Sequence, residues 1–131
     1  MINFFSKFKI IFYLTNFFLI LLYLYPGSIL GSIIYGDKNI QPQITPDFLI
    51  SSNHFYVFIL VSLIGFLSFT KQKNIRYLIF YLIFLSIFLE VFHMIIPARS
   101  FQWPDLLGNF FGVIFVIFVK KLVNDYKLFK K

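Results

Sequence analysis

The sequence contains no cysteine, and this absence excludes disulfide bridges and thiolate chemistry. Charged residues are also scarce: they make up 13% of the 131 positions, whereas a soluble domain carries about 25%. Glycine-rich phosphate-binding loops and the H-E-x-x-H zinc motif are both missing. A chain with so little charge cannot cover a soluble core with polar surface, so a membrane protein is expected.

Hydrophobic residues, in contrast, make up 60% of the chain and include 21 phenylalanines. They fall into four long runs, at about 8–25, 54–70, 77–96 and 105–121. Each run approaches the roughly 20 residues that a helix needs to cross a hydrocarbon core. Backbone groups in lipid must find their hydrogen bonds within the segment, and the alternating polarity of a β-barrel is missing. We therefore expect an all-α integral membrane bundle of four transmembrane helices, forming a single domain over residues 1–131.

The segments outside the four runs are predicted to be connections. Residues 28–53 contain glycine and proline at a density typical of loops, and the apolar piece Ile29–Tyr35 is expected at the membrane interface. Residues 71–76 are predicted to be a short basic turn. The first run follows Lys7 and Lys9, as in a signal peptide, but it is longer than a usual apolar signal region. No A-x-A-like cleavage site follows it, so a retained helix is favoured.

The basic residues predict the orientation of the bundle. If the helices alternate in direction, ten of the twelve lysines and arginines lie on one side, together with both chain ends and the 71–76 turn. Only Lys38 and Arg99 lie on the other side. The positive-inside rule therefore places both termini in the cytoplasm and predicts a multi-pass protein of the plasma membrane. The rule also explains the net charge of +7, so nucleic acid is not expected as a partner.

Six polar residues are predicted to form a ligand-binding site in the outward half of the bundle. Glu90 and His93 lie three residues apart and share a helix face. Glu90 lies about 10 Å from the predicted helix end at Pro97, and an unpaired acid near the membrane centre costs roughly 2.5–3.5 kcal/mol. It therefore needs a partner, for which His93 is the nearest candidate and Arg99 the next, and we expect a Glu90–Arg99 pair across the outer mouth. The six residues are His54, Glu90, His93, Arg99, Asp105 and Asn109.

Several of these residues have a purely structural alternative. Asp105 stands at a predicted helix start, where an acid complements the helix dipole, so capping explains it equally well. Asn109 can link helices, and His54 can be an interfacial residue. The small-x-x-x-small pair Gly108 and Gly112 is more typical of close helix packing than of a functional site.

Metal binding and catalysis are weaker interpretations of the same residues. Glu90-x-x-His93 resembles half of a helical carboxylate site, and His54 and Asp105 could add ligands. These ligands would come from three helices and match no zinc motif, so neither a metal nor another cofactor is expected. No catalytic residue is assigned, because no serine stands in a recognisable nucleophile setting.

A spaced pattern covers the six site residues. It comprises His54-Phe55, Glu90-x-x-His93, Pro97-x-Arg99-x-Phe101 and Asp105-x-x-x-Asn109-x-x-Gly112. The pattern resembles the VanZ-like family over about residues 10–120, and the segment 90–112 carries most of the likeness. The resemblance implies a membrane protein of this size and helix number. It also implies a role in the cell envelope or in antibiotic resistance, because the best-known member is associated with resistance to the glycopeptide teicoplanin.

Three functions are compatible with these features. In the favoured one, a non-enzymatic protein binds a cell-envelope lipid, a cell-wall precursor or a glycopeptide, and Arg99 meets an anionic group. The second is a membrane enzyme acting on lipid-linked substrates with Glu90 or His93 as general base, although it lacks an identifiable nucleophile. The third is a small proton-coupled transporter, suggested by the Glu–His pair, which would need to form a homodimer. Membrane lipids are the expected partners in each case.

Overall fold

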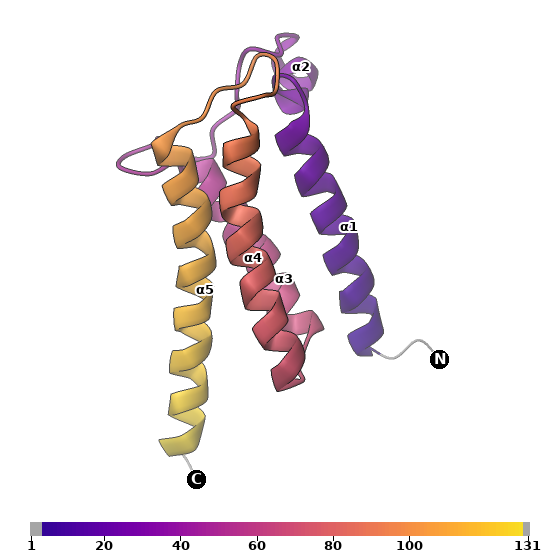
Figure 1. Cartoon of the computed structure of the whole chain (residues 1–131), viewed down its shortest axis with the longest axis vertical. Helices are drawn as coiled ribbons and strands as arrows, with labels where there is room; N and C mark the ends of the chain where they lie inside the picture. Colours follow the sequence, from indigo (N-terminus) through magenta and orange to yellow (C-terminus); the bar gives the residue numbers. More distant parts are fainter. Residues whose placement is uncertain (1–3, 130–131) are drawn as a thin grey trace.

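The computed structural model describes residues 4–129, and these form five α-helices and no strand (Figure 1). The prediction of an all-α chain is therefore confirmed. The four long helices alternate in direction, so α1 begins and α5 ends at the same end of the bundle (Figure 1). The helices are α1 (Phe4–Leu24), α2 (Ile29–Tyr35), α3 (Ser52–Ser68), α4 (Gln72–Phe92) and α5 (Trp103–Phe129).

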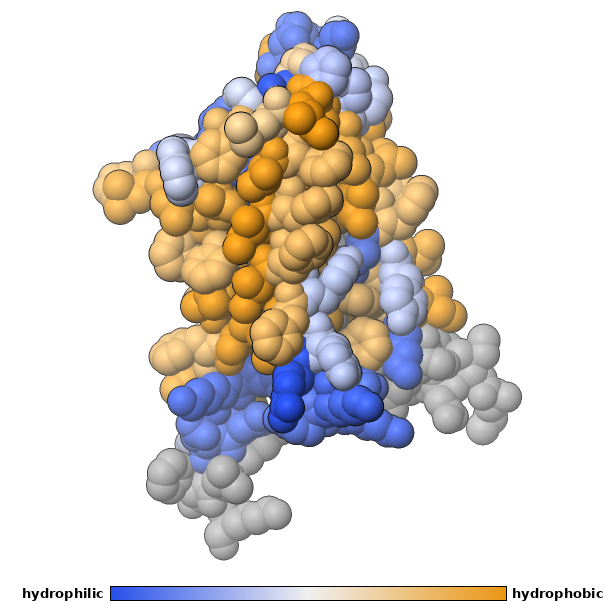
Figure 2. Space-filling view, viewed as in Figure 1, coloured by the Kyte–Doolittle hydropathy of each residue, from blue (hydrophilic) through white to orange (hydrophobic). Residues whose placement is uncertain are grey.

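The two ends of the bundle differ in composition. One end, which we call the basic end, forms a hydrophilic zone in Figure 2. The opposite end, which we call the loop end, holds α2 and the connecting segments 25–51 and 93–102 (Figure 1). Between the two ends, Figure 2 shows a wide hydrophobic band. The basic end carries Lys71, Lys73, Arg76, Lys120 and Lys121.

The helices differ in how well they suit a membrane. α4 and residues Trp103–Tyr126 of α5 are long and apolar enough to cross one. Residues Phe8–Leu24 of α1 pass the same test only together with α2, and this pair is bent by 80° at the break between them. α3 is apolar but shorter, with 17 residues. The described residues thus provide two helices that could span a membrane, or three if the bent pair forms one span.

The boundaries of α4 differ from the prediction at both ends. Residues 71–76 are not a turn, because α4 begins at Gln72 and includes Lys73 and Arg76. Lysine and arginine are good helix formers, so the helix includes them and starts before the apolar run from which its boundary was predicted. α4 also ends earlier than predicted, at Phe92 instead of near residue 96. Directly after it, the His93 N–H donates a hydrogen bond to the Glu90 carbonyl at 3.1 Å. His93 is therefore a cap residue and does not lie within the helix.

Segment 28–53 contains a helix that its glycine and proline content did not predict. The Ser28 hydroxyl accepts a hydrogen bond from the Gly31 N–H at 2.9 Å and so caps the start of α2. Gly36 ends α2 in the left-handed conformation, with a φ of 69°, which glycine adopts without a steric cost. The rest of the segment is irregular, and the Asp47 carboxylate joins it to α3 by accepting from the Ser52 N–H at 2.7 Å.

The core is built around the contact between α3 and α5, which is the most extensive in the bundle. A Cβ atom at Gly108 would lie 2.6 Å from the Ser51 carbonyl oxygen, and one at Gly112 would lie 2.6 Å from that of Phe55. The packing interpretation of the glycine pair is therefore confirmed, because only glycine permits this approach. The buried apolar core consists of Phe12, Leu19, Tyr23, Phe58, Val61, Leu78, Leu82, Leu85, Leu89 and Val113.

Candidate functional site

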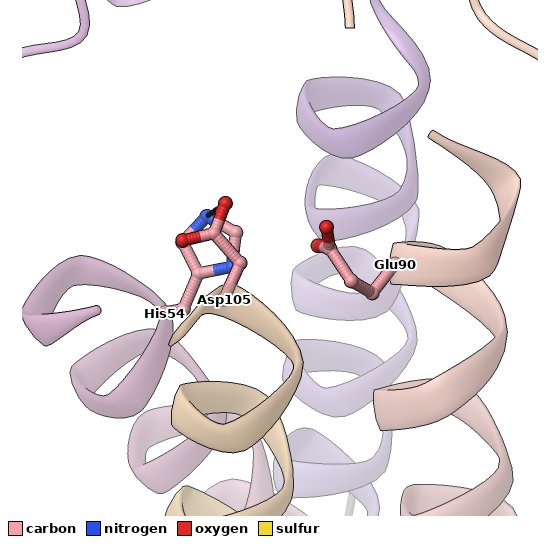
Figure 3. Close-up of side chains that lie close together, drawn as sticks. All are labelled: His54, Glu90 and Asp105. Carbon is pink, nitrogen blue, oxygen red and sulfur yellow. Dashed lines mark ion pairs between the residues drawn. The ribbon is translucent and has the colours of Figure 1, made fainter. Parts of the chain in front are cut away.

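Three helix ends meet at the loop end, and each contributes one side chain that can titrate or bind a metal (Figure 3). His54 lies in the first turn of α3, Glu90 in the last turn of α4 and Asp105 in the first turn of α5. His54 Nε2 lies 3.7 Å from Asp105 Oδ2. One ligand atom from each of the three residues lies within 4.8 Å of the other two. We call these three residues the three-helix cluster.

Glu90 is completely buried, and the backbone and His93 hold its carboxylate. Oε1 accepts a hydrogen bond from the backbone N–H of Gln102 at 2.9 Å. Oε2 lies 3.1 Å from Nδ1 of His93 but accepts no hydrogen bond. Of the two partners that the sequence suggested for Glu90, His93 is therefore the one in contact.

Arg99 contacts α1 instead of Glu90, so the predicted Glu90–Arg99 pair is wrong. Its Nε donates to the Tyr25 carbonyl at 3.2 Å, and one Nη donates to the carbonyls of Leu22 at 3.1 Å and Gly27 at 2.6 Å. These carbonyls belong to the last turn of α1 and the turn that follows it. The last carbonyls of a helix lack partners within the helix, and the helix dipole favours a cation beside them.

The charge of Arg99 is not neutralised locally. Among the residues that the structure describes, no carboxylate oxygen lies within 4.0 Å of its guanidinium. Partial burial lowers the pKa of Arg99, and electrostatic interactions with Tyr23, Glu90 and Asp105 oppose that shift. A guanidinium remains protonated in proteins, so a permanent positive charge stands at the loop end.

Tyr23 joins the histidines to the helix core, and sequence reasoning missed it. Its ring stacks on that of His93 at 5.7 Å and lies 5.0 Å from that of His54. Its hydroxyl donates to Asn109 Oδ1 at 2.7 Å, and the Asn109 amide donates to the Ser86 carbonyl at 3.2 Å. Asn109 thus links α1, α4 and α5, as its structural interpretation predicted. The only signal in the sequence was a tyrosine within an apolar run, whose hydroxyl needs a partner when buried.

Two adjoining cavities of opposite character open at the loop end. The first has a volume of about 220 Å³ and mainly apolar walls from α1, α3 and segment 41–44. The second has a volume of about 190 Å³ and mainly polar walls. The apolar cavity includes Leu19, Leu22, Ile29, Leu30, Ile44 and Val57 in its lining. The polar cavity includes Gly27, Lys38, Asn39, Ser100, Gln102 and Asp105. The two share Ser28, Gln41, His93 and Arg99.

All six residues that the sequence predicted for the site lie at the loop end, but they do not form one cluster. Arg99 and Asn109 mainly hold helices together. Ser28, Gln41 and Gln102 were missed, because a polar residue in a connecting segment gives no signal of the cavity it will line. The four residues that do meet are His54, Glu90, His93 and Asp105.

No protein-family model, curated protein or solved structure matches this chain. The likeness to the VanZ-like family therefore stays a prediction drawn from the spaced residues of segment 54–112.

Proposed function

We propose that this chain is a multi-pass protein of the plasma membrane that binds an anionic lipid at its loop end. The ligand would be a cell-envelope lipid or a lipid-linked cell-wall precursor. The observation that carries this proposal is the pair of adjoining cavities, one apolar and one polar, which meet at Arg99. A lipid has the same division between an apolar chain and a polar head group.

The proposed topology has four membrane crossings with both chain ends in the cytoplasm. It is supported by the alternating direction of the four long helices and by the lysines and arginines gathered at the basic end (Figures 1 and 2). The loop end then faces outward. α3 spans about 25 Å at 1.5 Å per residue, somewhat less than a hydrocarbon core of about 30 Å. Its polar first turn is largely enclosed by the bundle, so its shortness exposes little polar surface to lipid.

The proposed binding mode follows from the N–H donors of Arg99 that make no hydrogen bond to α1 or its turn. A guanidinium has five N–H donors, and the Nε and one Nη of Arg99 hold carbonyls of α1 and its turn, which leaves the other Nη. An anionic phosphate group would satisfy these donors and neutralise the charge. Lys38 lines the same polar cavity and adds a second positive charge. Leu19, Leu22 and Val57 would cover the first part of an acyl or prenyl chain.

Binding suits these residues better than catalysis. His93 Nε2 is engaged by the Tyr23 carbonyl at 3.0 Å, and the Tyr23 hydroxyl donates to Asn109. Neither group is therefore arranged as a base beside a nucleophile. The resemblance to the VanZ-like family adds a proposed role in the cell envelope, with glycopeptide resistance as its phenotype. Expression in a teicoplanin-susceptible bacterium should then raise the inhibitory concentration of teicoplanin, and Arg99→Gln should abolish the increase.

The direct test is native mass spectrometry of the full chain in nanodiscs that contain both zwitterionic and anionic phospholipids. The wild type should retain one anionic lipid per chain. Arg99→Gln should reduce this retention at least tenfold, and Lys38→Gln should reduce it less. Arg76→Gln is the matched control, because Arg76 lies at the basic end, and it should retain lipid like the wild type.

Lys38→Gln also separates binding from folding. Arg99 braces α1, so its loss could destabilise the bundle, whereas the Lys38 side chain is exposed. Retention of zwitterionic and anionic lipids in equal amounts by the wild type would contradict the proposal. So would unchanged retention in both the Arg99 and the Lys38 variant.

A further inference from the structure

We infer that His54, Glu90 and Asp105 bind a divalent transition-metal cation, for which zinc is the best-fitting candidate. This inference stands apart from the proposed lipid ligand, because it uses side chains of the three-helix cluster and not the charge of Arg99. Each of the three residues comes from a different helix end, so one cation would join α3, α4 and α5 at the loop end (Figure 3).

The donor set suits such a cation chemically. It offers one imidazole nitrogen and two carboxylate oxygens, a combination that zinc and other first-row divalent cations accept. Calcium and magnesium prefer oxygen ligands alone, so the histidine argues against them. Three protein ligands also leave a fourth position for water or for an anionic group, as in zinc sites that are not closed.

The geometry is close to that of a zinc site. The three ligand atoms already lie within 4.8 Å of one another, without any change of backbone. Around a tetrahedral zinc with bonds of about 2.0–2.1 Å, neighbouring ligand atoms lie about 3.4 Å apart. A bound cation would therefore require the three side chains to move closer together, and Figure 3 shows Glu90 extending toward the neighbouring His54 and Asp105.

Two buried atoms of the cluster lack the hydrogen bonds that buried polar atoms normally make. Glu90 is completely buried, and its Oε2 accepts no hydrogen bond, although it lies 3.1 Å from His93. Nδ1 of His54 is also buried without a hydrogen-bond partner. Buried polar atoms make hydrogen bonds in the great majority of cases, so two atoms without one at the same place call for an explanation. A cation bound between them would interact directly with Oε2 of Glu90, in addition to the contact that this atom makes with His93.

The negative charges of the cluster also favour a bound cation. Carboxylate oxygens of Glu90 and Asp105 lie within 4.8 Å of each other, and Glu90 is completely buried, which is unfavourable if both groups are ionised. A divalent cation would neutralise both. His93, beside Glu90, would then orient the carboxylate, as the outer partners of metal-binding carboxylates commonly do.

The test is metal analysis of the full chain, purified in lipid-free detergent with a tag that contains no histidine. The protein is stripped with EDTA, incubated with zinc chloride, desalted and measured by inductively coupled plasma mass spectrometry. We expect one zinc per chain in the wild type. Glu90→Gln and Asp105→Asn should each lower this stoichiometry at least tenfold. Asp125→Asn, which removes an exposed acid of α5 at the basic end, should retain one zinc.

A second measurement needs no variant and therefore remains informative if the substitutions prevent folding. Cobalt(II) added to the stripped wild type should give the visible absorption of a site with four or five ligands, and zinc should abolish it by displacement. The inference is overturned if the wild type binds neither metal. It is also overturned if folded Glu90→Gln and Asp105→Asn retain as much zinc as Asp125→Asn. Because lipid is absent, failure of the lipid proposal would not alter either result.

Discussion

Glu90 is the residue whose burial demands most compensation, because it is the one completely buried acid among the described residues, and a buried carboxylate is costly unless it is paired. Part of the compensation comes from the turn that follows α4. The backbone N–H of Gln102 donates a hydrogen bond to Oε1 of Glu90 at 2.9 Å, and Nδ1 of His93 lies 3.1 Å from Oε2. The chain around residues 93–102 thus folds over the acid and holds it at the loop end, within reach of His54 and Asp105.

This arrangement predicts which partner of Glu90 is energetically coupled to it. In a double-mutant cycle, Glu90→Gln and His93→Gln should show a coupling energy of about 0.5–3 kcal/mol, as residues in contact do. The matched cycle of Glu90→Gln with Arg99→Gln should show a smaller coupling, because Arg99 bonds to α1. The measurement is the unfolding free energy in mixed detergent, with EDTA present so that metal does not contribute. A larger coupling for the Glu90–Arg99 pair would contradict the structure.

Among the helices, α5 depends on close contact with α3. The Cβ of an alanine at position 112 would meet the Phe55 carbonyl oxygen at 2.6 Å and the Phe58 Cβ at 2.9 Å. A backbone oxygen cannot move aside as the end of a flexible side chain can, so the two helices would have to separate. The three-helix cluster would be disturbed as well, because His54 and Asp105 lie at the ends of these same helices.

Gly112→Ala should therefore destabilise the bundle by about 1–3 kcal/mol, the usual cost of overpacking. Gly112→Leu should cost more and should prevent accumulation of the folded protein. Phe111→Ile is the matched control on the neighbouring, half-exposed position, and it should change stability little. Thermal unfolding in detergent measures all three variants. If Gly112→Ala were as stable as the control, the close approach of α3 and α5 would be wrong.

α1 is attached to the bundle differently from α5. Its end is held by Arg99 and by His93, which contact carbonyls of Leu22, Tyr23, Tyr25 and Gly27. An 80° bend separates α1 from α2, and Ser28 in the turn between them lines both cavities. The site is therefore assembled from the ends of helices and from the segments that cap them.

For the whole molecule, the distribution of charge predicts how the bundle sits in the membrane. The chain has no cysteine, so single cysteines can be introduced without background. Cysteines at Lys38 and at Gln102, both at the loop end, should react with a membrane-impermeant thiol reagent in intact cells. A cysteine at Lys73, at the basic end, should react only after the membrane is permeabilised. Labelling of position 73 but not of position 38 in intact cells would reverse the proposed orientation.

Hydropathy and charge are local properties of a sequence, and what depends on them alone could be predicted. The four apolar runs correspond to the four long helices, and the six residues predicted for the site all lie at the loop end. The predicted helix boundaries were less accurate, because hydropathy shows which residues suit lipid but does not show where the backbone hydrogen bonds of a helix begin and end. Lys73 and Arg76 therefore belong to a helix, and a short helix lies within the segment that glycine and proline marked as a loop.

The sequence by itself thus determined an all-helical, strongly apolar chain with a basic end and a set of polar residues at the opposite end. Only the tertiary structure decided which of those residues meet. Arg99 bonds to carbonyls more than 70 positions earlier in the chain, and the three-helix cluster joins residues 36 and 15 positions apart. Such contacts depend on where each helix ends and how closely glycines let helices approach. No local pattern of residues contains that information.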